Sequence, residues 1–454
     1  MSNLNTEGGC QVNKTIRTGA AISRRNALAG IGASSIAAAF PSPTIAQARP
    51  EKLVFVADNG PWHWTLVEEV APAFEEAYGI PVEFNLLPID GLNARLRTEF
   101  ISNGQGIDVA QWISYWAGWI DPYMEDHNIL LSEADGPSSH EYDWDDFLAP
   151  TKALASYGER LLGIPYRALV TVLHYQEPAL ASAGIPSPPE TWDELLTAAA
   201  KITATDPPDR YGYGLLGRQG PAIIGSFSPF LYSNGGTMFD AQSQQISINS
   251  QRAIEALEFL TDLMRTHKVV PPEATTWEYD EIIANAQRNR FGMTVTLAPY
   301  GSLMNDNAQS QTAGNWKAVP VPGRFEKDEG RSWLNGWMFG VPKSSKNKRW
   351  AFEFIQMATT RHWLRRSMLR GNAPTRASAL RDPELVGKFP WAPAAETMLT
   401  TAIPDPNHPI WPTLDLSLRS GLSKALTGVQ APKEALDQVA SEWERSLRRA
   451  GILR

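Results

Sequence analysis

One stretch in the middle of the chain, residues 163–203, limits the folds open to this protein more than any other. Residues 168–173 form an apolar, β-branched run of strand length. The prolines within residues 186–189 make a stiff turn, because proline fixes φ and has no N–H to donate. Thr191 and Glu194 then have the spacing of a capping box, which begins a helix. The sequence therefore predicts a buried strand, a rigid turn and a docked helix in succession.

The N-terminal region has the features of an export signal. Residues 23–28 contain a twin-arginine pattern, residues 27–40 form an apolar stretch, and residues 46–48 form an A-x-A peptidase site. The apolar stretch is shorter than the ~20 residues that a membrane-spanning helix needs. We therefore expect residues 1–48 to be a twin-arginine signal peptide, cleaved near Arg49, and the protein to be periplasmic.

Composition excludes several classes of function. The one cysteine, Cys10, lies in the predicted signal, so the mature chain has no thiol for a disulfide, a nucleophile or a thiolate metal site. The net charge of the whole chain is −8, and the predicted signal is itself basic. An acidic exported protein is a poor binder of nucleic acid or anionic membranes. All 16 tryptophans follow the predicted signal, which is reason to look for aromatic ligand platforms.

After the signal, strands and helices alternate. The order strand, helix, strand, helix, strand is predicted over residues 53–56, 66–78, 80–84, 91–103 and 107–110. Pro72 inside the first helix predicts a kink or a late helix start. Such an order favours a parallel, doubly wound α/β lobe, in which ligands bind at the carboxyl ends of the strands.

Several separated motifs carry a resemblance to one family. Residues 163–203, the GVPKSSKNKRWAFEFI run at 340–355 and the GNAPTR run at 371–376 resemble the extracellular sugar-binding proteins of ABC importers. By this resemblance, which covers nearly all of residues 51–451, the chain is identified as a member of the extracellular solute-binding family 1, the maltose-binding-protein-like group.

The resemblance implies a fold and a division of the chain. The expected fold is α/β, the two-lobe periplasmic-binding-protein fold (type II), with the ligand in the cleft between the lobes. The N-terminal lobe would hold residues 51–167 and 299–340, and the C-terminal lobe residues 168–298 and 341–454. A ligand that contacts both lobes favours the closed state, which a membrane permease would recognise.

Two loops at the predicted strand ends hold candidate ligand-binding residues. Stacking on the apolar face of a sugar ring and hydrogen bonding to its hydroxyls are the expected contacts. The candidates for stacking are Trp62, Trp64, Tyr115 and Trp116, and those for hydrogen bonding are Asn59, His63 and Gln111. Core packing is the alternative for each tryptophan, and we assign Trp112 and Trp119 to the core. His63 has no histidine or carboxylate at metal-ligand spacing, so no metal site is expected.

The resemblance implies further ligand contacts along the chain. They are Tyr166 and Arg167 at a crossover, Tyr300 at a position where sugar binders place an aromatic ring, Asn335, Gly336 and Trp337 in a strand with a small-residue kink, Arg376 in the GNAPTR run, and Trp411. The Arg376 guanidinium could form a fork to vicinal hydroxyls or pair with an anion, and a helix-cap salt bridge is the alternative. Asp143, Asp145 and Asp146 lack the glycine and glutamate of a calcium loop, so a solvated surface is expected there.

The function that follows is capture of a sugar or sugar-like solute for an ABC importer permease, by a monomer without cofactor or metal. A binding protein for a polyamine or for a sulfonated or phosphorylated anion is the alternative. A polyamine site would need several carboxylates beside aromatic rings, and an anion site would need arginines such as Arg167 and Arg376. An exported glycoside hydrolase would need two carboxylates paired across the scissile bond, and Asp58, Asp90 and Asp121 show no such pairing by spacing. We therefore expect no enzymatic activity.

Overall fold

A computed structural model of the protein describes residues 49–205, 209–240 and 245–453. The predicted signal peptide lies outside these residues. These residues belong to one compact unit, and most of the strands form one continuous ladder in the order β2 (Val82–Leu87), β1 (Leu53–Asp58), β3 (Val109–Ile113), β12 (Trp333–Gly340), β6 (Ile164–Gln176), β10 (Phe291–Leu297) and β7 (Tyr211–Gly214).

The first part of this ladder is parallel. The strands β1 (Leu53–Asp58), β2 (Val82–Leu87) and β3 (Val109–Ile113) alternate with the helices α1 (Ala71–Tyr78) and α2 (Ile89–Ile101). Strand β1 pairs in parallel with β2 and with β3. The predicted strand–helix alternation is confirmed. A short π-helical segment, Leu66–Val70, precedes α1, and Pro72 lies in the first turn of α1, as a late helix start requires.

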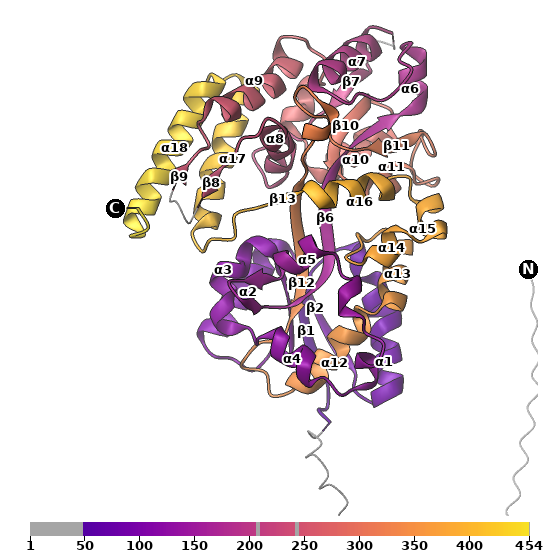
Figure 1. Cartoon of the computed structure of the whole chain (residues 1–454), viewed down its shortest axis with the longest axis vertical. Coiled ribbons are helices and arrows are strands. Elements are labelled where there is room, and N and C mark those ends of the chain that lie inside the picture. The colour runs from indigo at the N-terminus through magenta and orange to yellow at the C-terminus, as the bar shows by residue number, and fades with distance from the viewer. Residues whose placement is uncertain (1–48, 206–208, 241–244, 454) are drawn as a thin grey trace, which may run out of the picture. The chain divides into compact units, whose positions relative to one another are not determined.

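Two long antiparallel strands connect this part to the rest of the molecule (Figure 1). They are β6 (Ile164–Gln176) and β12 (Trp333–Gly340), which pair with each other from Leu334 opposite Val170 to Phe339 opposite Ile164. The other edge of β12 pairs with β3, and the C-terminal half of β6 pairs with β10 and β11. Both strands therefore belong to the two halves of the fold at once.

The second part of the ladder contains β10 (Phe291–Leu297) between β6 and β7 (Tyr211–Gly214). Strand β11 (Trp316–Val319) pairs with Leu173–Gln176 of β6, and β13 (Ile403–Pro404) pairs with the start of β12. Two small hairpin ladders lie apart from it, β4 (Ser156–Tyr157) with β5 (Arg160–Leu161) and β8 (Phe239–Asp240) with β9 (Gln245–Ile246).

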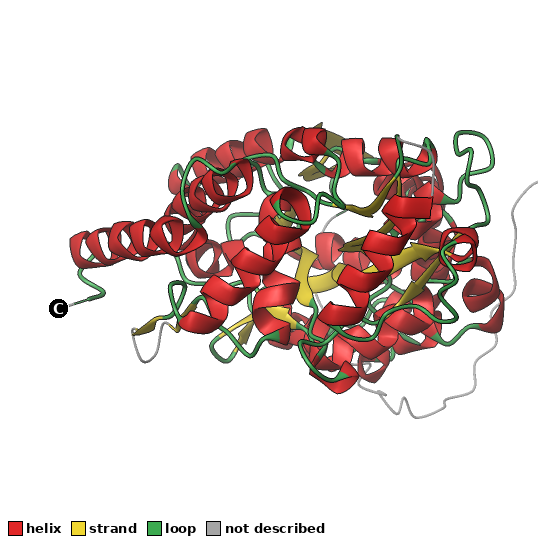
Figure 2. Ribbon diagram, turned by 90° about the horizontal axis from the view of Figure 1, so that it is seen from above, coloured by secondary structure: helices red, strands yellow, loops and turns green. Residues whose placement is uncertain are grey.

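Helices surround the strands (Figure 2). In the first half α12 (Lys348–Ala358) packs on β3 and β12. In the second half a group of four helices packs together, α8 (Ala222–Ser233), α9 (Gln251–Arg265), α17 (Trp411–Thr427) and α18 (Pro432–Arg449). The other helices are α3 (Ala117–Ile120), α4 (His127–Glu133), α5 (Ala149–Leu154), α6 (Glu177–Ser182), α7 (Trp192–Thr205), α10 (Tyr279–Gln287), α11 (Tyr300–Met304), α13 (Arg361–Leu369), α14 (Ala377–Leu380), α15 (Pro383–Lys388) and α16 (Ala392–Thr401).

The stretch at 163–203 folds as strand, turn and helix, with one difference at the cap. The Thr191 hydroxyl accepts from the Glu194 N–H at 3.4 Å, as a capping box requires. The Glu194 carboxylate, however, accepts from the N–H of Glu190 at 2.8 Å and not from that of Thr191. The Thr191 side-chain half of the predicted capping box is confirmed, and the return bond is shifted by one residue.

Close packing between β7 and α7 leads to a stability prediction. A Cβ added at Gly212 would lie 2.0 Å from the Ala199 carbonyl oxygen, and a helix backbone cannot yield as a flexible side chain does. We expect Gly212→Ala to lower the free energy of unfolding by about 1–3 kcal/mol, the usual cost of overpacking. Urea denaturation measures this, with Gly387→Ala in exposed α15, where a Cβ meets nothing within 4 Å, as the control. Equal stability of both variants would contradict the prediction.

Candidate functional site

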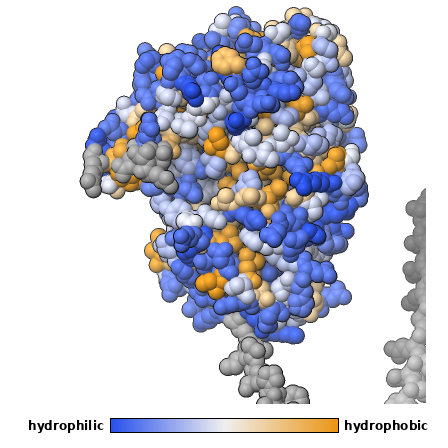
Figure 3. Space-filling model, in the orientation of Figure 1, coloured by the Kyte–Doolittle hydropathy of each residue, from blue (hydrophilic) through white to orange (hydrophobic). Residues whose placement is uncertain are grey.

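A cavity of about 330 Å³ lies where β6 and β12 cross from one half of the fold to the other. The sequence-predicted residues that line it are Asn59, Trp62, Tyr115, Arg167, Tyr300, Asn335, Trp337 and Trp411. They come from both halves of the ladder and from the two long strands. The face of the molecule seen in Figure 3 is largely hydrophilic, with apolar side chains in scattered patches.

The floor of the cavity consists of alternate residues of the two long strands. Arg167 and Leu169 of β6 lie opposite Trp337 and Asn335 of β12 in the antiparallel register. Because successive side chains of a strand point to opposite faces, these four share one face. We call Arg167, Leu169, Asn335 and Trp337 the floor.

One corner of the cavity is built around a carboxylate at the end of β1. The Oδ1 atom of Asp58 accepts from Trp62 Nε1 at 3.1 Å and lies 2.6 Å from His63 Nε2. Burial opposes ionisation of Asp58, but the hydrogen bonds and charge of His63, with the Arg167 charge, outweigh it and lower the pKa of Asp58 below its ordinary value. Within the described residues, every side-chain donor to this carboxylate uses Oδ1. We call Asp58, Asn59 and Trp62 the Asp58 corner.

The Arg167 side chain presents donors to the cavity. Its guanidinium lies 3.9 Å from the centre of the Trp62 ring, a stacked cation–π contact, and the residue is only 5% exposed. No described residue accepts a hydrogen bond from it at normal geometry, and burial lowers its pKa from the ordinary value. A buried guanidinium with five unused N–H groups is costly unless a ligand or solvent supplies acceptors.

A second unused polar group lies beside it. Asn335 is 5% exposed, and its Oδ1 atom is buried without a hydrogen-bond partner in the described part of the chain. Buried amide oxygens are nearly always bonded in native proteins. Asn335 and Arg167 are therefore two polar side chains of the floor that have no hydrogen-bond partner for these groups among the described residues.

Aromatic rings close the other sides of the cavity. Tyr279 and Tyr300 meet edge to face with centroids 5.4 Å apart, and Trp333 and Trp411 line the same wall. Flat apolar rings with a few convergent polar groups are the usual composition of small-molecule sites. Tyr279 and Trp333 were not predicted from the sequence.

Three carboxyl groups and one arginine form what we call the acidic wall, Glu278, Asp405, Asp415 and Arg419. Each carboxyl has a protein partner. The side chain of Glu278 caps α10, Asp405 accepts from Trp333 Nε1 at 2.6 Å, and Asp415 pairs with Arg419 one helical turn away. Burial raises the pKa of all three carboxyl groups, to about 7 for Asp405.

The pKa of Asp405 leads to a pH dependence of stability. The unfolded chain ionises this group near 3.8, whereas the folded protein keeps it protonated to about pH 7. Its stabilising contribution is therefore fully present below pH 3.8 and lost as the pH rises through 7. We expect the melting temperature of Asp405→Asn, relative to wild type, to increase from pH 5 to about pH 7 and to level off above pH 7, where both the folded and the unfolded wild type are ionised at this position. Thermal melts across this range measure it, and a constant difference would contradict it.

Three predicted residues support the Asp58 corner without lining the cavity. His63 is bonded to the Asp58 carboxylate, and Gln111 Oε1 accepts from the Asp58 N–H at 2.9 Å. The Tyr166 hydroxyl donates to the Trp62 carbonyl at 2.7 Å, and its ring stacks on His63. These side chains hold the corner in place.

The remaining predicted residues lie elsewhere. Trp116 is buried behind the floor and packs edge-on against Trp337, with centroids 6.2 Å apart. Trp64 is 54% exposed and outside the cavity lining, and Gly336 lies between two floor residues on the opposite face of β12. Trp112 is fully buried, as the core assignment expected.

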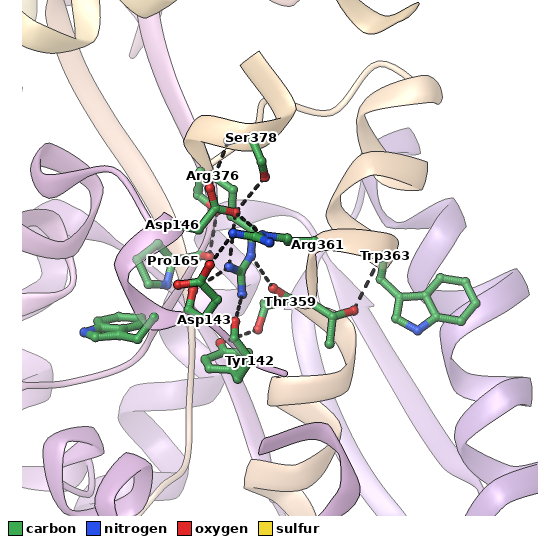
Figure 4. A network of polar contacts seen from close by, with 12 residues as sticks. Tyr142, Asp143, Asp146, Pro165, Thr359, Arg361, Trp363, Arg376 and Ser378 are labelled. Carbon is green, nitrogen blue, oxygen red and sulfur yellow. Dashed lines mark hydrogen bonds and ion pairs between the residues drawn. The ribbon is translucent and has the colours of Figure 1, made fainter. Parts of the chain in front are cut away.

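Arg376 does not reach the cavity because protein groups occupy its guanidinium (Figure 4). The side chain is fully buried and donates to the carbonyl oxygens of Thr359, Asp143 and Tyr142 at 2.8–2.9 Å, and to the Asp146 carboxylate at 3.4 Å. Arg376 therefore resembles the helix-cap salt bridge, which was the alternative expected from the sequence, more than it resembles a ligand contact. Most of its partners, however, are backbone carbonyls of a loop and of a helix end. Asp143 and Asp146, expected on a solvated surface, also pair with Arg361.

Within the described residues no group of three or more His, Cys, Asp or Glu side chains could hold a metal ion. None of the helices within residues 49–205, 209–240 and 245–453 is both long enough and apolar enough to cross a membrane.

Comparison with known proteins agrees with this architecture. Residues 65–362 match the model of the bacterial extracellular solute-binding protein family. A probable amino-acid ABC transporter periplasmic-binding protein of Sinorhizobium fredii is 26% identical, over 85% of this chain and 87% of its own. The mannitol-binding protein of Pseudomonas aeruginosa is 25% identical, over 93% of this chain and 98% of its own.

A solved structure shows the same fold. The ABC transporter solute-binding protein of Agrobacterium radiobacter K84, in complex with ribitol, superposes with a TM-score of 0.77 at 22% identity, covering 87% of this chain and 99% of its own. The two-lobe fold expected from the sequence is thereby confirmed. The chain belongs to the bacterial extracellular solute-binding protein family.

Proposed function

We propose that the protein captures a small polyhydroxylated solute, an acyclic polyol or a monosaccharide, outside the cytoplasm and delivers it to the permease of an ABC importer. The mannitol-binding relative and the ribitol-bound structure support the ligand class. The observation that carries the proposal is the floor of the cavity, where the Asn335 Oδ1 atom is buried without a partner and the Arg167 guanidinium stacks on Trp62 without a hydrogen-bond acceptor among the described residues.

The size of the cavity favours a small ligand. Ligand cavities in proteins span roughly 300–1,000 Å³, and this one, at about 330 Å³, is near the lower limit. Such a volume suits a single sugar or a sugar alcohol better than an oligosaccharide.

The arrangement of donors and acceptors favours hydroxyl groups. Arg167 offers only donors, the Asp58 carboxylate offers only acceptors, and both line the same cavity. A hydroxyl both donates and accepts, so one hydroxyl can bond both residues. A ligand anion next to Arg167 would be repelled by Asp58. A polyamine would find carboxylates that already have protein partners.

Capture would use the two lobes. We propose that the lobes meet at β6 and β12 and close over a ligand that bonds to both, since a ligand stabilises the state in which it makes more contacts. The pairing of β11 with β6 supports assigning residues 299–332 to the C-terminal lobe. The packing of α12 on β3 supports assigning α12 to the N-terminal lobe. In the division expected from the sequence, each of these two segments was assigned to the other lobe.

The family supports two further parts of the proposal, the location and the absence of catalysis. We propose a periplasmic protein, exported through the twin-arginine signal, that binds its ligand and breaks no bond. Carboxyl groups that line the cavity are bonded to protein partners, Asp58 to His63 and Trp62, Asp405 to Trp333 and Asp415 to Arg419, which supports binding without catalysis.

Ligand titration of the purified protein tests the proposal. Tryptophan fluorescence and melting temperature would be followed against acyclic polyols, monosaccharides, disaccharides, sugar acids, amino acids and polyamines. A ligand that binds only the native state raises the melting temperature in a saturable way. We expect the largest shift from a polyol or monosaccharide, without product formation. A larger shift from an amino acid, which the Sinorhizobium fredii relative makes a fair competitor, would overturn the ligand class.

A further inference from the structure

Asp405 is the residue of the acidic wall that lies in the connection between β13 and α17. It directly follows β13, which pairs with the start of β12, and it lies between the floor strand and α17. The residue is 7% exposed and lines the cavity. Its Oδ1 atom accepts from Trp333 Nε1 at 2.6 Å, and no other described group donates to the carboxyl.

The nearest cation is already paired with another group. Arg419 contacts both carboxylate oxygens of Asp415, through Nε at 3.0 Å and through Nη2. No lysine, arginine or histidine nitrogen of the described chain lies within 4 Å of the Asp405 carboxyl. The Arg419 guanidinium therefore neutralises Asp415 and leaves Asp405 without a paired cation.

The other titratable groups around Asp405 do not supply a positive charge. They are the phenols Tyr115, Tyr232 and Tyr279 and, three residues along the chain, His408. Burial raises the pKa of the three phenols and lowers that of His408, so all four are neutral at pH 7. A buried carboxyl with one indole donor and no counter-ion favours its neutral form.

We propose that Asp405 is a specificity-determining residue that meets the ligand as a neutral carboxylic acid and donates a hydrogen bond to a ligand hydroxyl oxygen. The bound ligand displaces the water that would solvate a charged carboxylate, so binding and protonation support each other. The site then takes neutral polyols, and its affinity falls when Asp405 ionises. The inference rests on the proposed function.

The affinity should depend on pH in a defined way. The pKa of Asp405 is about 7 before the ligand binds, and only the protonated form binds tightly. The dissociation constant should therefore rise about tenfold between pH 6 and pH 8. Near pH 7 the complex should take up roughly half a proton.

Isothermal titration calorimetry with D-mannitol, and then with ribitol, tests this at pH 6, 7 and 8 and in two buffers of different ionisation enthalpy. Asp405→Asn keeps a carbonyl for the Trp333 N–H and an amide donor for the ligand. We expect it to bind within about threefold of wild type at pH 6, with no proton uptake and no pH dependence. Asp437→Asn on exposed α18 is the matched control and should keep the wild-type dependence.

The outcomes separate the two proposals. If no polyol or monosaccharide binds at pH 6, the proposed function is overturned before any pH comparison is made. If a polyol binds wild type equally at pH 6 and pH 8, or if Asp405→Asn retains the pH dependence, the ligand class stands and the role of Asp405 is overturned. Thermal melts of each variant show whether it is folded.

Discussion

Replacing Arg167 with alanine is expected to weaken polyol binding by about 100-fold, since hydrogen bonds to a charged group contribute about 1.5–3 kcal/mol each. Stability should respond in the opposite sense. In the ligand-free protein the guanidinium is buried with no acceptor among the described residues, so its removal should leave the melting temperature unchanged or higher. Calorimetric titration and thermal melts of the same samples measure both effects.

A conservative variant separates charge from geometry at this position. Arg167→Lys keeps the positive charge but loses the planar fork and its stacking on Trp62. We expect its affinity to lie between those of wild type and alanine. If the Arg167→Ala variant binds the polyol as well as wild type does, Arg167 is not a ligand contact.

The second large effect is expected on folding. Arg376→Met should lower the free energy of unfolding by about 3–5 kcal/mol, because it leaves buried partners of a charged group uncompensated. The carbonyls of Thr359, Asp143 and Tyr142 lose their donor, and only the packing on Phe147, 3.9 Å from the guanidinium, is partly kept. Urea denaturation monitored by tryptophan fluorescence measures the change.

Two comparisons define that result. Arg365→Ala removes a partly exposed arginine that pairs with Asp382 and Glu384, and should cost no more than about 1 kcal/mol. Any Arg376→Met protein that folds should bind the polyol with wild-type affinity, since the cavity does not include this residue. A large loss of affinity with little loss of stability would restore the ligand role that the GNAPTR resemblance implied.

Local signals made the fold predictable from sequence. Alternating strands and helices, the Thr191 cap and the late helix start at Pro72 depend on neighbours in the chain, and all were found. Pro72, for example, lies in the first turn of α1, where its missing N–H removes no helix hydrogen bond. One local detail was missed. The Glu194 carboxylate accepts from the Glu190 N–H and not from the neighbouring Thr191 N–H, a choice that the capping-box spacing does not determine.

The site was predictable where residues follow strand ends and not where they meet through tertiary contacts. Asn59, Trp62 and Tyr115 follow β1 and β3 and line the cavity as expected. Asp405 and Arg419 come from the C-terminal part of the chain and reach the cavity only because β13 and α17 pack against the second half. Arg376 shows the reverse. Its motif was found, but the carbonyls that hold it lie more than 200 residues earlier for Asp143 and Tyr142.

The two strands that form the floor also suggest how such proteins acquire new ligands. The side chains that face the cavity alternate with the small residues Ala168 and Gly336, which face away from it, and Gly336 has no room for a larger group. A Cβ on Gly336 would lie 2.8 Å from Leu154 Cδ1 and 3.1 Å from the Arg167 carbonyl oxygen. Substitutions at the floor positions would therefore change the proposed ligand contacts, while the small residues on the other face would preserve the backbone connection. During evolution, ligand selectivity can change through substitutions at the floor positions while the pairing of β6 with β12 between the lobes is kept.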